Sequence, residues 1–488
     1  MADPRDPSAE GDLPTLSMPA VDDPQEPTRM HVRLFGSTAF FRLWLTQVVS
    51  ATGDWLGFLA IAALATRLSP ERPEAAIGLV MSARIVPGFF LGPAAGVFAD
   101  RFDRKRLMVL CDIGRALVLA TLPFVDTVPG LIVASLVLEV FTLLWAPAKE
   151  ASVPHIVPSD HLTTANSLSL VAAYGTIPLA AGIFSLLAKA SEWLGDFELL
   201  TVLRGTPEGL AFYFDAATFG LSALMIYSLP LPRRRKEERA RTSGRRIEFG
   251  SAWRELREGW EFVFINPVVR SVNLGLATGL IGGGMLVPLG PVFAEDVLGS
   301  GQAGFGVLIF ALGLGVAGGV VTISVFQKRV PKEWAFVTAV FVAGASLLAA
   351  ASMSAIVLAS VFVFVLGVCA GTVYVLGFTM LHEHVEDDLR GRIFSALYTL
   401  VRLCVLISFA VGPFLSELFG ELSDAVFDDN HLSVFGASIA VPGVVLTLWT
   451  AGLIIVAAGF IAASSMRDAA RKEMVDMPKG TGSNGTDA

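Results

Sequence analysis

Apolar stretches of about twenty residues recur along the whole chain, and they limit its fold more than any other feature. A bilayer core about 30 Å thick is crossed by roughly 20 apolar residues in a helix. Because backbone groups find no water in lipid and the stretches are too long for barrel strands, we expect helices. The predicted spans are 39–66, 74–99, 106–125, 129–148, 165–189, 210–230, 269–294, 302–326, 334–352, 354–380, 393–418 and 441–465.

The composition excludes a soluble enzyme with a single membrane anchor. The 488 residues are 53% hydrophobic and 16% charged, with a mean hydropathy of +0.64, whereas soluble domains are about a quarter charged. Cys111, Cys369 and Cys404 fall inside apolar stretches, so they predict small buried side chains and no disulfide framework. Residues 1–38 are polar, acidic and rich in proline, which predicts a disordered tail and no cleavable signal peptide.

Lys and Arg are concentrated in alternate connections, and this asymmetry predicts the orientation of the chain. They occur after spans two, six, eight and ten, whereas the loops after spans three, seven, nine and eleven contain none. Basic loops stay on the cytoplasmic side, so we expect both termini in the cytoplasm and a multi-pass protein of the plasma membrane. The expected organisation is a tail at 1–38, a six-helix half at 39–230, a basic linker at 231–268, a second half at 269–465 and a disordered tail at 466–488.

The two halves resemble each other in sequence. The segment "VPSDHLTTANSL" enters span five and "VEDDLRGRIFSA" enters span eleven. Pro178 lies inside span five, and Gly412 and Pro413 lie at a comparable depth in span eleven. A duplicated six-helix unit is typical of transporters, with a substrate site between the halves near the membrane midplane. In the linker, Trp253, Leu256 and Trp260 predict an interfacial helix.

The segment "GVFADRFDRKR" at 96–106 places a charged cluster between two apolar spans. Its residues fit the pattern G-x-x-x-D-R-x-x-R-[KR] at Gly96, Asp100, Arg101, Arg104 and Lys105. This pattern, between spans two and three, resembles that of the major facilitator superfamily, and the resemblance implies a gate at the cytoplasmic face. The alternative interpretation is an ordinary positive-inside loop.

Further segments resemble one bacterial branch of this superfamily, the exporters of macrolides and of enterobactin-type siderophores. They are "VVSATGDWLG", "APAKEASVPHIVPSDHLTTANSL", "FYFDAATFGLSAL" and "DLRGRIFSAL". The resemblance implies an all-α membrane protein of twelve helices in two six-helix halves related by a pseudo-twofold axis, which exports amphipathic compounds in exchange for protons. The antiporter motif of span five, usually G-P-x-x-G-G, reads "IPLAAG" here and retains only Pro178 and Gly182.

Six ionisable residues fall at membrane depth, where a charge usually faces a cavity or a partner. They are Asp54, Arg84, Arg115, Glu139, Asp215 and Arg402. From a rise of about 1.5 Å per residue, Asp54 lies about 20 Å and Arg84 about 16 Å from the cytoplasmic end, and Arg115 and Glu139 both lie at about 14 Å. These heights predict two ion pairs, Asp54–Arg84 and Glu139–Arg115. Asp112 precedes Arg115 by three residues and is a further candidate partner.

The roles of these charges stay open on sequence alone. Asp54 and Glu139 are candidates for proton coupling, with a purely structural ion pair as the alternative for each. Asp215 follows a polar loop closely, which favours snorkelling or capping over coupling. Arg402 is either a cation for an anionic substrate or a paired structural residue.

The sequence therefore predicts a proton-coupled exporter of amphipathic small molecules. The alternatives are a facilitator that imports or flips a metabolite or lipid, and a transporter-like sensor without transport. We expect no enzymatic activity, no cofactor beyond the proton gradient, no metal, no nucleic-acid partner and a monomer. The triplet His382-Glu383-His384 is interpreted as a solvated helix end rather than a metal site.

Overall fold

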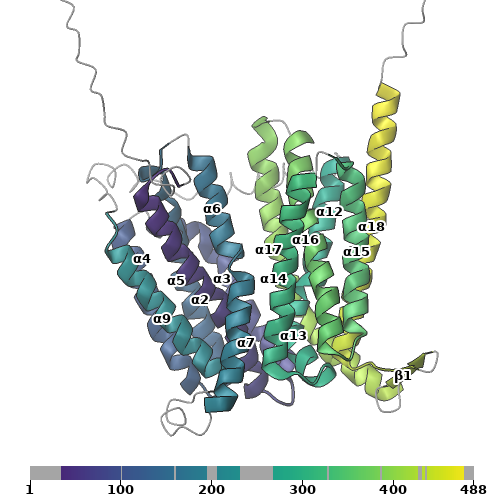
Figure 1. The fold of residues 1–488 in the computed structure, drawn as a ribbon, viewed down its shortest axis with the longest axis horizontal. Helices are drawn as coiled ribbons and strands as arrows, with labels where there is room; N and C mark the ends of the chain where they lie inside the picture. Colours follow the sequence, from purple (N-terminus) through teal and green to yellow (C-terminus); the bar gives the residue numbers. More distant parts are fainter. Residues whose placement is uncertain are drawn as a thin grey trace, which may run out of the picture.

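The computed structural model describes residues 35–99, 102–158, 161–194, 206–230, 267–326, 329–384, 387–426, 431–434 and 437–476, and these residues are almost entirely helical (Figure 1). Eleven helices of this part are long and apolar enough to cross a membrane. Helix α3 (Pro73–Ala99) lies among them, against α2, α5 and α17, and completes the bundle as the twelfth. The predicted twelve-helix membrane fold is confirmed.

The helices of the first half match the predicted spans within a few residues. They are α2 (Thr38–Leu68), α3 (Pro73–Ala99), α4 (Arg104–Thr121) with the short η1 (Leu122–Phe124), α5 (Val128–Glu150) with η2 (Val153–His155), α6 (Leu162–Tyr174), α7 (Ile177–Leu194) and α9 (Pro207–Tyr227).

The second half follows the same plan and adds one small sheet. Its elements are α12 (Pro267–Gly284), α13 (Leu286–Val292), a π-helical turn (Phe293–Val297), α14 (Gly301–Phe326), α15 (Lys332–Ala351), α16 (Ile356–His384), α17 (Asp387–Val426), the strands β1 (His431–Val434) and β2 (Ala437–Ala440), and α18 (Gly443–Asp476). The strands pair antiparallel, from His431 opposite Ala440 to Val434 opposite Ala437, in what the sequence predicts as an acidic loop.

Short polar side chains start several of these helices. Ser37, Asp103, Thr127 and Thr206 each accept a hydrogen bond from a backbone N–H in the first turn of α2, α4, α5 and α9. These N–H groups have no partner within their own helix, so a side-chain oxygen stabilises the start. Span five is divided differently, because α6 ends at Tyr174 and Pro178 is the second residue of α7. Proline lacks an N–H and is best tolerated in a first turn.

Both predicted tails are shorter than expected. Helix α18 continues to Asp476, so residues 466–476 of the predicted disordered tail are helical. At the other end, the Phe35 ring lies 5.0 Å from the rings of Phe41 and Trp44, so the described residues before α2 pack onto it. Most of the basic linker, including the predicted interfacial helix at 253–260, lies outside the described residues.

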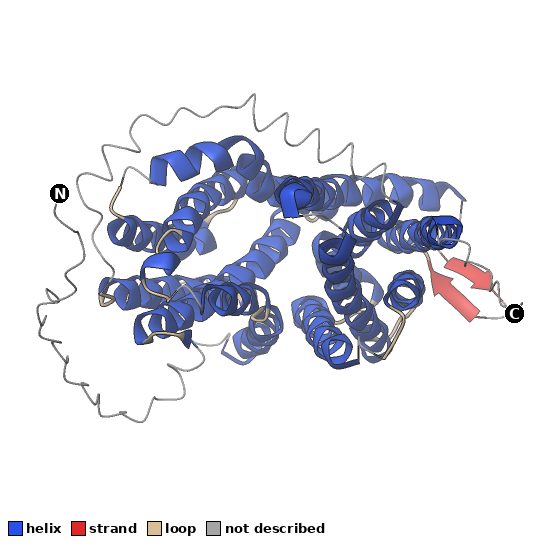
Figure 2. Ribbon diagram, turned by 90° about the horizontal axis from the view of Figure 1, so that it is seen from above, coloured by secondary structure: helices blue, strands red, loops and turns tan. Residues whose placement is uncertain are grey.

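The two halves stand side by side and contact each other mainly toward one end of the bundle (Figures 1 and 2). This is the end where α2 finishes and α3 begins. There Arg72 pairs with Glu417 at 3.3 Å, Ser416 donates to Glu74 at 3.3 Å, and Ser185 donates to the carbonyl of Ala303 at 2.9 Å. Toward the opposite end, where α2 begins, the ribbons diverge in Figure 1, and no hydrogen bond or ion pair between two described residues joins the halves.

Two of the contacts between halves join a proline to a glycine. A Cβ placed on Gly313 of α14 would lie 2.8 Å from Cδ of Pro178 on α7, and one on Gly78 of α3 would lie 3.1 Å from Cβ of Pro413 on α17. A larger residue than glycine would therefore push the helices apart at either point. The two predicted proline sites of spans five and eleven thus occupy equivalent joints between the halves.

Candidate transport site

A buried arginine forms the centre of a charged network inside the first half. Arg115 of α4 is 2% exposed, and its guanidinium forms ion pairs with Asp112 on its own helix and, at 3.5 Å, with Asp54 on α2. The guanidinium carbon lies 4.2 Å from the ring centroid of Phe219 on α9 and 5.3 Å from that of Trp145 on α5. Aromatic faces and carboxylates both stabilise a desolvated cation.

The second acid of the network is held from α9. Ser222 donates a hydrogen bond to Oδ2 of Asp112 at 2.6 Å, while Oδ1 of the same carboxylate contacts Arg115. Asp112 is therefore bound on both oxygens and fully enclosed, whereas Asp54 is 35% exposed. This difference makes Asp54 the acid of the network with access to its surroundings.

Neither of the two predicted ion pairs, Asp54–Arg84 and Glu139–Arg115, forms between the described residues. Asp54 pairs with Arg115 and not with Arg84, and the pairing of Asp112 with Arg115 is confirmed. The charge that acts most strongly on Glu139 of α5 is that of Arg84 on α3. Depth along a helix could not give the rotation of each helix about its axis, which decides the partner of a charge.

A second group of charges lies where the halves face each other. Glu139 is influenced by Arg84 from its own half and by Arg402 of α17 from the other half. Arg84 lies 5.7 Å from the ring centroid of Phe58, and that ring is 5.7 Å from Phe409 of α17. Arg402 is exposed and forms no ion pair with a described residue. Of its two predicted roles, an available cation fits this environment better than a paired structural residue.

Asp215 contradicts the prediction of snorkelling or capping. The side chain is 1% exposed and points from α9 toward α2. Its nearest polar contact is Thr218 on the same helix, at 3.3 Å from Oδ1. Its position close to a polar loop in sequence was misleading, because a space between glycines of α2 receives the carboxylate inside the bundle.

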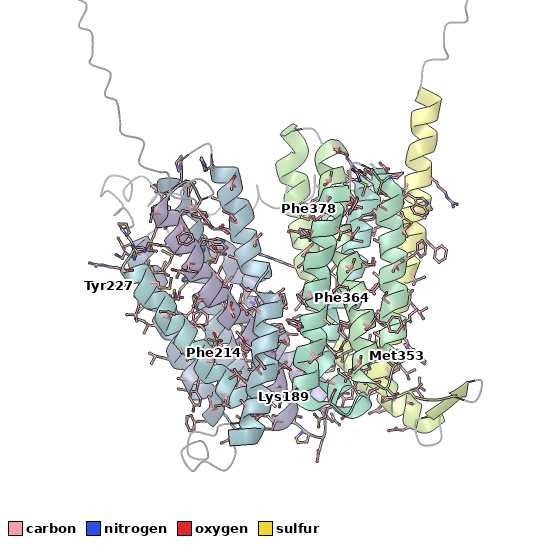
Figure 3. The ribbon with its side chains drawn as sticks, viewed as in Figure 1. Lys189, Phe214, Tyr227, Met353, Phe364 and Phe378 are labelled. Atoms are coloured by element: carbon pink, nitrogen blue, oxygen red, sulfur yellow. The ribbon has the colours of Figure 1, made fainter. Side chains whose placement is uncertain are left out.

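The predicted gating motif is described only in part. Gly96 lies in α3, while Asp100 and Arg101 fall outside the described residues. Arg104 contacts Nδ1 of His155 at 3.3 Å. Lys105 donates to the carbonyl of Leu229 at 2.8 Å, just beyond α9, and lies 5.4 Å from the Tyr227 ring, labelled at the outer edge of the first half in Figure 3. The motif thus ties the start of α4 to the end of α9.

The proline and glycine sites lie at the joints between helices. A Cβ on Gly182 of α7 would lie 3.5 Å from Phe310 of α14, and one on Gly412 would lie 3.1 Å from Met285. Glu383, from the triplet read as a helix end, pairs with Lys332. In the part of the chain that the structure describes, no three metal-binding side chains come together.

Several residues that contact the buried acids escaped the sequence analysis, namely Ser222, Thr218, Gly53 and Gly57. A signal for them was present. Asp215, Phe219 and Ser222 are spaced four and three residues apart, which places them on one helix face. Gly53 and Gly57 are likewise one turn apart on α2, a spacing typical of close helix contact in membranes.

Comparison with known proteins decides the family. The model of the Major Facilitator Superfamily matches residues 43–409. The chain belongs to this superfamily. It is 26% identical over 395 residues to the uncharacterized MFS-type transporter YfiS of Bacillus subtilis strain 168, covering 78% of this chain and 87% of the relative. It is also 25% identical over 400 residues to the multidrug efflux pump Tap of Mycobacterium tuberculosis H37Rv, covering 79% and 87%.

Solved structures of the superfamily share the fold. A bacterial homologue of the human lysosomal transporter Spinster, in an inward-facing and unoccupied conformation, aligns with a TM-score of 0.65 at 16% identity over 90% of this chain and 98% of that one. A D-xylose-proton symporter aligns with a TM-score of 0.60 at 12% identity over 87% and 97%. As a facilitator, this chain is a multi-pass membrane transporter, and its charged residues lie within and between the two halves of a transporter fold.

Proposed function

We propose that the chain is a secondary active transporter that exports amphipathic small molecules across a bacterial plasma membrane in exchange for protons. The observation that supports this function best is the network of Asp54, Asp112 and Arg115 inside one half, with a partly exposed acid at its edge. An acid beside a movable cation gains and loses a proton as its surroundings change. A multidrug efflux pump among the relatives is consistent with export.

Alternating access accounts for the arrangement of the halves. In this conformation the halves contact each other at the end where α3 begins, through Arg72–Glu417 and Ser416–Glu74. We infer that the opposite end, which carries the gating motif, is cytoplasmic together with both termini. A transporter open to one side keeps contacts on the other and exchanges them during the cycle.

The substrate region carries both aromatic and charged groups. Trp55 and Phe58 lie 5.9 Å apart with rings nearly perpendicular, and Phe409 continues the row across the halves. Arg84 lies beside this row, and Arg402 is seven residues before Phe409 on α17, which places both on one face of that helix. An amphipathic molecule would contact apolar surface and charge in the same region. We expect the transporter to act as a monomer.

Transport by the purified protein in proteoliposomes tests the function. Vesicles in which the cytoplasmic face points outward are given an acidic lumen, and a cationic, a neutral and an anionic amphipathic dye are offered outside. Export by proton exchange predicts accumulation of a dye in the lumen that collapses when a protonophore removes the gradient. Accumulation that ignores the protonophore would contradict proton coupling.

The exposed Arg402 supports a second candidate, uptake of an anionic metabolite together with a proton. The same vesicles distinguish it, because an acidic lumen would then drive a preloaded anion outward. Movement of no probe under any gradient would favour the transporter-like sensor instead.

A further inference from the structure

The carboxylate of Asp215 occupies a notch in the surface of α2. A Cβ on Gly53 would overlap Oδ1 of Asp215, and a Cβ on Gly57 would overlap Oδ2. The two glycines are one helical turn apart, so together they open a gap into which an acid from α9 fits. The acid is 1% exposed and therefore separated from water.

The carboxyl group of Asp215 has one weak hydrogen-bond partner among the described residues. Thr218 Oγ lies 2.8 Å from the backbone carbonyl oxygen of Asp215 and 3.3 Å from its Oδ1. A hydroxyl has one hydrogen and two lone pairs, and the shorter contact takes the hydrogen. The longer contact to Oδ1 is therefore weak, and it gives an ionised Asp215 carboxylate little compensation for its burial.

The surrounding charges give the same result. No cation of the described residues lies within ion-pair distance of Asp215. The strongest charge that acts on it is the negative charge of Asp54 on α2, followed by Arg84 of α3 and Arg115 of α4, and the described parts of α7 and η1 add none. Arg115 is already engaged by Asp112 and Asp54. An ionised carboxylate would be desolvated without compensation, which is unfavourable by several kcal/mol.

We propose that Asp215 is a buried proton-binding site, distinct from Asp54, that is occupied in this conformation and takes part in the transport cycle. Its part in the cycle rests on the proposed proton coupling, whereas its protonation does not. The ligand is a single proton, bound as the O–H of the carboxyl group. Release breaks that O–H bond and passes the proton to water, which requires α9 and α2 to separate at the glycine notch.

Infrared difference spectroscopy of the protein in lipid at neutral pH tests the protonation directly. Asp215→Asn should remove a carbonyl stretching band of a protonated carboxylic acid, because the amide matches the shape and lacks that group. Asp54→Asn and the exposed Glu71→Gln should keep this band. Loss of carboxylate bands alone in Asp215→Asn, or loss of the acid band in Asp54→Asn instead, would overturn the proposal.

Two further variants keep the test decisive if Asp215→Asn does not fold. Thr218→Val removes the neighbouring hydroxyl and preserves the acid, so the acid band should persist and shift to higher frequency; absence of an acid band that responds to this change overturns the proposal. Gly57→Ala should lower the melting temperature, and the double variant Gly57→Ala with Asp215→Ala should recover it. Gly220→Ala on α9 is the matched control, because a Cβ there meets nothing within 4 Å.

Transport separates this proposal from the proposed function. If the unmodified protein accumulates a dye in response to the gradient and Asp215→Asn does so equally, the role of Asp215 in the cycle is overturned while proton coupling stands. If the unmodified protein shows no response to the gradient, proton coupling fails, and the infrared band still decides whether Asp215 holds a proton.

Discussion

The two halves have the same helical plan but differ in what fills their interiors. Among the described side chains, every buried charged residue lies in the first half: Asp112, Arg115, Lys149, Glu208 and Asp215. The second half is held by close backbone contact. A Cβ on Gly319 of α14 would overlap the carbonyl oxygen of Val368 on α16, and one on Gly371 of α16 would overlap that of Val316.

This difference indicates a division of labour between the halves. In lipid, apolar side chains gain little by moving from lipid to protein, so small residues that let backbones approach stabilise a helix pair. The second half uses this solution and has no buried charged side chain among the described residues. The first half retains charges that cost stability, and such a cost is typical of functional positions in membranes.

The largest expected effect is loss of transport in Asp54→Asn. The variant fixes the exposed acid in a neutral form, so it should bind a dye and exchange it down a concentration gradient but fail to accumulate it against one. Accumulation in proteoliposomes with an imposed pH gradient is the measurement, with the exposed Asp424→Asn of the second half as control. Equal accumulation by Asp54→Asn at equal protein content would place the coupling acid elsewhere, with Glu139 the next candidate.

Arg115→Met should be the most destabilising change in the first half. It leaves Asp112 buried without its cation, and breaking a buried ion pair typically costs about 3–5 kcal/mol. Thermal unfolding in detergent should show the loss, and adding Asp112→Asn should recover part of it. Arg402→Met, which removes an exposed cation of the second half, should change stability little. An equal loss of stability in Arg402→Met would show that the two halves do not differ in this respect.

Gly319→Ala tests the backbone packing of the second half. The methyl group would overlap the Val368 carbonyl, so α14 and α16 must shift, and overpacking of this kind costs about 1–3 kcal/mol. Gly318→Ala is the matched control, because a Cβ there meets nothing within 4 Å. Unfolding in detergent should separate the two variants; identical melting would show that the close approach does not stabilise the pair.

The smallest expected effect belongs to Lys105→Met. Its ammonium satisfies the Leu229 carbonyl at the end of α9, and such a hydrogen bond contributes about 0.5–1.5 kcal/mol. Lys105→Arg should retain most of it. A loss above that range in the melting experiment would mean that Lys105 also holds a part of the gate beyond the described residues.

Span positions were predictable from the sequence, because the length of an apolar stretch is set by the thickness of the membrane. The partners of the charges were not. Asp54 and Arg84 are predicted at similar heights, yet Asp54 turns toward Arg115, since the packing of α2 and α4 against α9 sets the rotation. The role of Asp215 was predicted from its short sequence distance to a polar loop. That prediction did not take into account the notch that Gly53 and Gly57 form on α2.

The joints between the halves have a further consequence. Gly78 and Pro178 belong to the first half, and Gly313 and Pro413 to the second, so each half contributes one glycine and one proline. An interface in which the same two surface patches meet twice is isologous, the kind that joins identical subunits about a twofold axis. Each half thus carries both a glycine and a proline of this kind. Two copies of one half would therefore have complementary contact points.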